Sequence, residues 1–70
     1  MNGKDQFLYN LYLLPDNENL LITRVVEGMS ISESKQIAIE LEEEGLIQCL
    51  GNACEITEKG RSYCETNLQS

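Results

Sequence analysis

The sequence predicts a small, mainly α-helical domain with one β-hairpin, in the order helix, helix, helix, hairpin, helix. Three observations support this prediction. Apolar side chains recur at helical spacing in the segments 4–14, 18–27 and 31–44. Ser30 begins an S-x-x-E capping box, which is typical of the start of a helix. A Gly-Asn pair at 51–52 separates two short apolar segments, as in a hairpin with a two-residue turn.

The length and composition indicate one folded domain, spanning 1–70. Hydrophobic residues make up 41% of the chain, which is typical of a globular domain and not of a disordered segment. No apolar run approaches the ~20 residues that cross a bilayer, and the first residues lack the pattern of a signal peptide. We therefore expect a cytoplasmic domain that does not enter a membrane.

The first helix is predicted over about 4–14. Most of its apolar residues share one side, but Tyr9 and Leu13 fall outside that stripe. Covering a leucine or an aromatic ring is worth about 1.5–3 kcal/mol, so two such helices gain by pairing. Tyr9 and Leu13 are therefore predicted to form the interface of a homodimer. The alternative is that they pack on a neighbouring element of the same chain or stand exposed.

The second and third helices are predicted over 18–27 and 31–44. Asp16 or Asn17 is expected to cap the start of the second helix, and Gly28 to end it. The third helix begins at the capping box and ends at Gly45, and four residues are expected along one face of it: Ile31, Ser34, Ala38 and Leu41.

The hairpin is predicted over 46–57, and Thr57 is expected to cap a last helix over about 58–67. The two-residue turn places Cys49 opposite Cys54 in a non-hydrogen-bonded pair, about 4.5 Å apart at Cα. That separation permits a disulfide, so this pair is a candidate redox site. The alternative is that both are reduced, small apolar residues packing the hairpin on the core. The same turn predicts three further pairs: Leu50–Ala53, Gln48–Glu55 and Ile47–Ile56.

The residue types argue against catalysis and metal binding. The chain has no histidine, which removes the commonest acid-base group near neutral pH and the commonest metal ligand. Three cysteines without a fourth ligand make a poor structural zinc site. A chain of 70 residues has little room for the cleft and supporting side chains that paired carboxylates need. We expect no enzyme activity, no cofactor and no metal.

Two phrases, IELEEEGLI at 39–47 and CEITEKGRSY at 54–63, resemble the winged helix-turn-helix superfamily in the manner of MarR- and PadR-like regulators. In that superfamily a recognition helix ends in the first phrase, a two-stranded wing follows, and the second phrase opens the next helix. The resemblance covers about 19–64 and implies a winged helix-turn-helix fold, with 18–27 as the first helix of the motif. It also implies transcription regulation by DNA binding as a homodimer.

The resemblance implies a set of DNA contacts on the third helix and beside the wing: Ser32, Ser34, Lys35, Gln36, Lys59 and Arg61. The alternative for these residues is a solvated helix face and local ion pairs. The charge opposes DNA, because 12 acidic against 5 basic residues give a net charge of −7, which repels phosphate. The alternative function is therefore an acidic winged-helix module that binds a protein partner and no DNA.

Overall fold

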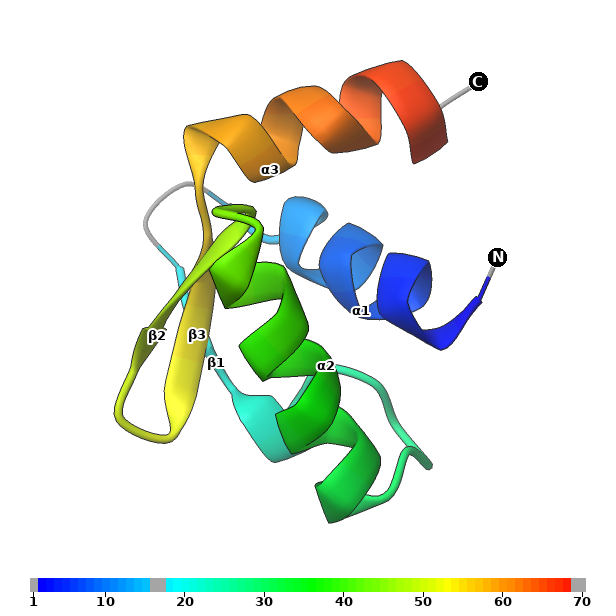
Figure 1. Ribbon diagram of the computed structural model, residues 1–70, viewed down its shortest axis with the longest axis vertical. Helices are drawn as coiled ribbons and strands as arrows, with labels where there is room; N and C mark the ends of the chain where they lie inside the picture. The colour runs from blue at the N-terminus through cyan, green and yellow to red at the C-terminus, as the bar shows by residue number, and fades with distance from the viewer. Residues whose placement is uncertain (1, 16–17, 69–70) are drawn as a thin grey trace.

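The structure, a computed structural model, describes residues 2–15 and 18–68. Helices and a small sheet alternate along the chain, and Figure 1 shows the strands gathered at one side with the helices beside them. None of the described helices is long and apolar enough to cross a membrane. The elements are α1 (Gly3–Tyr12), β1 (Leu20–Leu21), the 3-10 turn η1 (Ile22–Arg24), α2 (Ile31–Glu43), β2 (Ile47–Leu50), β3 (Ala53–Ile56), α3 (Glu58–Tyr63) and the π-helical turn η2 (Cys64–Leu68).

The first predicted helix is confirmed as α1, with a different start and end. Asn2 caps it, since its side-chain oxygen accepts a hydrogen bond of 2.8 Å from the backbone N–H of Asp5. The helix ends at Tyr12 because Leu14 precedes Pro15, and a residue before proline avoids helical backbone angles.

The predicted hairpin and its register are confirmed. All four cross-strand pairs are as expected, including Cys49 opposite Cys54. Gly51 has φ +65° in the turn, a left-handed conformation that glycine adopts without steric cost. A third strand extends this hairpin into an antiparallel sheet of order β1-β3-β2.

The α-helix predicted over 18–27 is wrong. Leu20 and Leu21 form β1, which pairs with β3, and η1 follows as a single 3-10 turn. The edge of β3 that faces away from β2 has backbone groups that need hydrogen-bond partners, and β1 supplies them by pairing with it. The N–H of Ile22 also donates to the carbonyl oxygen of Asn52 at 2.8 Å. The caps expected for this helix, Asp16 and Asn17, lie outside the described residues.

The third predicted helix is confirmed as α2. Its cap at Ser30 accepts a hydrogen bond of 3.1 Å from the N–H of Glu33. Gly45, with φ +78°, turns the chain out of the helix toward β2. Thr57 caps α3 as expected, because its side-chain oxygen accepts a hydrogen bond of 3.1 Å from the N–H of Gly60. The predicted last helix is helical throughout, with its second half wound as the π-helical η2.

One core joins the helices to the inner face of the sheet. Leucines and a phenylalanine from α1 lie against α2, β3 and the last helical segment. Because α1 and η2 both contribute to this core and contact each other, the N- and C-terminal segments hold each other in place. The buried apolar residues of the described chain are Phe7, Leu8, Leu11, Val25, Ile37, Ala38, Leu41, Leu46, Ile47, Cys54 and Cys64.

Candidate recognition surface

Two hollows lie between α2 and the tip of the β2–β3 hairpin. One is lined by Leu21, Ile22, Thr23, Ile31, Lys35 and Asn52. The other includes Ile22, Lys35, Ile39, Glu42, Cys49 and Asn52. Because Ile22, Lys35 and Asn52 line both hollows, we treat them as one surface and call it the tip groove.

The tip groove is bordered by exposed apolar side chains. Among the described residues, six large hydrophobic side chains are exposed, and three of them line the groove: Leu21 at 47%, Ile31 at 61% and Ile39 at 52%. Single exposed hydrophobic residues are normal on protein surfaces, but residues gathered around one hollow indicate an interaction site.

The geometry of the elements explains why these residues meet. Ile31, Lys35 and Ile39 are spaced four residues apart, so they lie along one side of α2. In the sheet, Leu21 pairs with Ala53, which pairs with Leu50 on its other side. These three form one row across the outer face, and Leu50 is 48% exposed. The apolar surface therefore continues from the groove onto the sheet.

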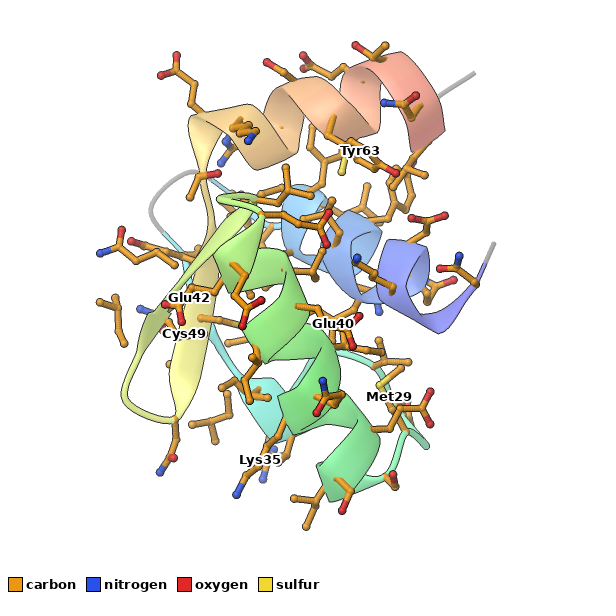
Figure 2. The ribbon with its side chains drawn as sticks, in the orientation of Figure 1. Met29, Lys35, Glu40, Glu42, Cys49 and Tyr63 are labelled. Atoms are coloured by element: carbon orange, nitrogen blue, oxygen red, sulfur yellow. The ribbon has the colours of Figure 1, made fainter. Side chains whose placement is uncertain are left out.

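The groove is lined by one basic side chain, Lys35, and one acidic side chain, Glu42. Lys35 is the basic residue of α2, and it borders both hollows. Glu42, near the C-terminal end of α2, accepts a hydrogen bond of 3.0 Å from the backbone N–H of Cys49. Figure 2 shows Glu42 and Cys49 together beside β2, with Lys35 farther down α2. The Glu42 contact joins α2 to the free edge of the sheet.

Three of the residues predicted to contact DNA lie together on the solvent side of α2: Ser32, Lys35 and Gln36 are exposed. Ser34 does not join them. It is 0% exposed, and its Oγ has no hydrogen-bond partner within the described chain. The expectation that Ser34 contacts DNA is therefore wrong, because its position on α2 points into the core.

Lys59 and Arg61 lie on another part of the molecule. Both belong to α3, which Figure 2 places at the opposite end from Lys35. The amine of Lys59 donates to the carbonyl oxygen of Glu44 at 2.9 Å, where it satisfies a free carbonyl at the end of α2. The structure therefore does not bring these two cations to the face that carries Lys35.

Another basic residue, Lys4, also pairs with residues of its own chain. The amine of Lys4 bonds to the carboxylate of Glu44 and lies 3.9 Å from that of Glu40. The hydrogen bond to Glu44 raises the pKa of Lys4, so it stays charged. Lys4 and Lys59 thus both serve the C-terminal end of α2, away from the tip groove.

The two residues predicted for a dimer interface differ in their surroundings. Leu13 is 63% exposed at the end of α1. Tyr9 is half-buried, and its ring stacks on that of Tyr12 with centroids 5.8 Å apart. Part of Tyr9 is therefore already packed within its own chain.

The cysteines are free thiols with raised pKa values. Burial raises the pKa of Cys54 to about 12 and, together with the charge of Asp5, that of Cys64 to about 11. Burial and the Glu42 carboxylate raise the pKa of Cys49. All three are therefore protonated at neutral pH. The described residues hold no group of three His, Cys, Asp or Glu side chains that could bind a metal ion.

The structure places Lys35 and Gln36 on the exposed side of α2, and their contact with DNA stays a prediction, whereas the contribution of Ile31 to this surface was missed. The sequence places Ile31 on one helix face with Ala38 and Leu41, which are buried, whereas Ile31 is the most exposed of the three apolar side chains that border the groove. The four-residue spacing from Ile31 to Ile39 was a visible signal for it. Comparisons of the chain with family models, with curated proteins and with solved structures find no match.

Proposed function

We propose that the chain is a winged-helix domain whose tip groove recognises a protein partner in transcription control. In this proposal the β2–β3 hairpin is the wing, and α2, preceded by the short turn η1, is the recognition helix. The observation that supports a protein partner is the set of exposed aliphatic side chains around a single lysine. This composition, apolar at the centre with few charges, is typical of protein interfaces.

The exposed side chains supply a driving force for association. Full burial of an isoleucine or leucine is worth about 1.5–3 kcal/mol, and roughly half of each groove residue remains to be covered. Each of Leu21, Ile31 and Ile39 therefore offers about 1 kcal/mol on binding an apolar surface. The gain is realised only when a partner covers these side chains and removes them from water.

Duplex DNA is the second candidate for the same surface, favoured by Ser32, Lys35 and Gln36 on the exposed side of α2. Affinity for DNA rises with the number of phosphates that a protein neutralises. The basic residue of α2 is outnumbered by its carboxylates, and the net charge of the chain is −7. Electrostatics therefore favours a protein partner over DNA.

Two parallel assays distinguish these candidates. A photo-reactive residue placed at position 23, which is exposed and lines the groove, is used for crosslinking in cells. The partner should be lost with Ile31→Asp and Ile39→Asp and retained with Tyr63→Asp, an exposed hydrophobic position on α3 outside the groove. In the second assay, purified protein selects from a random duplex DNA library. Enrichment of one sequence, abolished by Lys35→Ala, would instead establish DNA binding.

A further inference from the structure

Two thiols face each other beside the tip groove. Cys49 on β2 pairs directly with Cys54 on β3. The backbone N–H of Cys49 donates to Glu42 at 3.0 Å, so it points out of the hairpin at the free edge of β2. An N–H directed away from the partner strand marks a non-hydrogen-bonded pair, with Cα atoms about 4.5 Å apart. That distance lies within the range of about 4.4–6.8 Å found across disulfides.

Both side chains lie on the same side of the sheet. Alternate residues of a strand face opposite sides, and Cys54 is 0% exposed on the inner side. Residues directly opposite in an antiparallel pair share a side, so Cys49 also faces inward. Burial, and at alkaline pH the neighbouring Cys49 thiolate, raise the pKa of Cys54, as expected for adjacent sulfur atoms.

We propose that Cys49 and Cys54 form a reversible disulfide by exchange with a low-molecular-weight disulfide such as oxidised glutathione. The Cys49 thiol loses its proton to water, and its sulfur attacks one sulfur of oxidised glutathione. The S–S bond of glutathione breaks, and one molecule of reduced glutathione leaves. Cys54 then loses its proton and attacks the Cys49 sulfur, releasing the second glutathione. The protein loses two hydrogen atoms, and the oxidant gains them.

The order of the two steps follows from access. Cys49 is half-buried and lines the groove, whereas Cys54 has no exposed surface. An external disulfide therefore reaches Cys49 first, and Cys54 completes the reaction from within. Cys64 is buried on η2 and has no cysteine opposite it, so it serves as an internal control.

The disulfide would act on the tip groove through Cys49. Cys49 lines the same hollow as Lys35, Ile39 and Glu42. A covalent link to β3 fixes that wall of the groove in one position. This consequence for binding rests on the proposed function, whereas formation of the disulfide does not.

The test uses the full chain, reduced and then incubated with oxidised glutathione at pH 7 and pH 8. Free thiols are alkylated after denaturation, and intact mass and peptide mapping identify the products. We expect one alkylated cysteine of the three, at Cys64, and a peptide linking Cys49 to Cys54. The rate should rise about tenfold between the two pH values, because the thiolate fraction of a thiol with a pKa well above the pH rises by that factor.

Three variants assign the roles. Cys54→Ala should stop at a stable glutathione adduct on Cys49, and Cys49→Ser should yield neither adduct nor disulfide. Cys64→Ala should react as the parent does. Circular dichroism confirms that each variant is folded, and Cys54→Ser replaces Cys54→Ala if the latter is not. Three alkylated cysteines in the parent, a persistent adduct on it, or a disulfide that includes Cys64 would overturn the proposal. If the disulfide forms but crosslinking from the groove of the reduced protein captures no partner, the result counts against the proposed function alone.

Discussion

Gly60 of α3 lies directly against the carbonyl group of Leu46, so that a Cβ on Gly60 would be 2.1 Å from the Leu46 oxygen. The same Cβ would lie 2.7 Å from the Ile56 side chain. The Leu46 oxygen is held in place because it accepts a hydrogen bond of 3.1 Å from the N–H of Thr57. The contact sets how closely α3 approaches the start of β2, and it requires a residue without a side chain.

We therefore expect Gly60→Ala to destabilise the domain. In an exposed helix interior this change would add about 1 kcal/mol of stability. Here the methyl group meets backbone, and overpacking of this kind costs about 1–3 kcal/mol. The melting temperature should fall by roughly 4–8 °C for each kcal/mol lost in a domain of this size. Ser62→Ala, at an exposed position on α3, is the matched control and should leave melting nearly unchanged. An unchanged or higher melting temperature for Gly60→Ala would contradict this packing.

Ser34→Ala is expected to stabilise the domain. The Ser34 hydroxyl is fully buried and has no partner among the described side chains and backbone groups. An unsatisfied buried hydroxyl costs about 1–3 kcal/mol, and alanine is also the better helix former. Chemical denaturation of parent and variant measures the difference. A clear loss of stability would mean that the hydroxyl makes a hydrogen bond and that its burial is not a cost.

Stability should decrease at alkaline pH partly because of Cys54. The folded state keeps the Cys54 proton up to a pKa of about 12, whereas the unfolded chain releases it near the ordinary value of 9.0. Between these values the unfolded state binds fewer protons, so the free energy of unfolding falls as pH rises. One proton gives a slope of at most about 1.4 kcal/mol per pH unit.

The contribution of Cys54 is measured by comparing the parent with Cys54→Ala in urea titrations at pH 8, 9 and 10. Lys4, Cys49 and Cys64, whose pKa values are also raised, contribute to the alkaline loss in both proteins. The variant should therefore lose stability less steeply than the parent above pH 9. Parallel curves would mean that Cys54 titrates alike in the folded and unfolded chains.

Local signals in the sequence predicted the elements that depend on neighbouring residues. The Gly51–Asn52 pair fixes the turn, and the turn fixes the register of every pair in the hairpin. The caps at Ser30 and Thr57 are likewise formed by residues three positions apart. These features need no tertiary partner, which is why a single sequence suffices to predict them.

The errors fall where distant segments decide the outcome. The spacing of Leu20, Leu21 and Ile22 suits a helix as well as a strand, and the free edge of β3, more than thirty positions along the chain, selects the strand. The location of Lys59 depends in the same way on how α3 packs against the end of α2. Local pattern cannot supply either contact, so the predicted DNA surface combined cations from two ends of the molecule.

The homodimer predicted from α1 remains a prediction. Of its two predicted interface residues, only Leu13, at the end of that helix, is largely exposed. Leu13 is 63% exposed, while Tyr9 already packs on Tyr12. Burying two copies of Leu13 across a two-fold axis would gain roughly 1–2 kcal/mol for each side chain, against the repulsion of two chains that each carry −7. Sedimentation equilibrium at micromolar concentration should give a dimer mass that Leu13→Glu lowers to that of the monomer. Leu50→Glu, at an exposed position on the opposite sheet face, should keep the dimer. Because screening weakens repulsion, the dimer should also tighten as salt rises. A monomer mass for the parent protein at every salt concentration would refute the dimer.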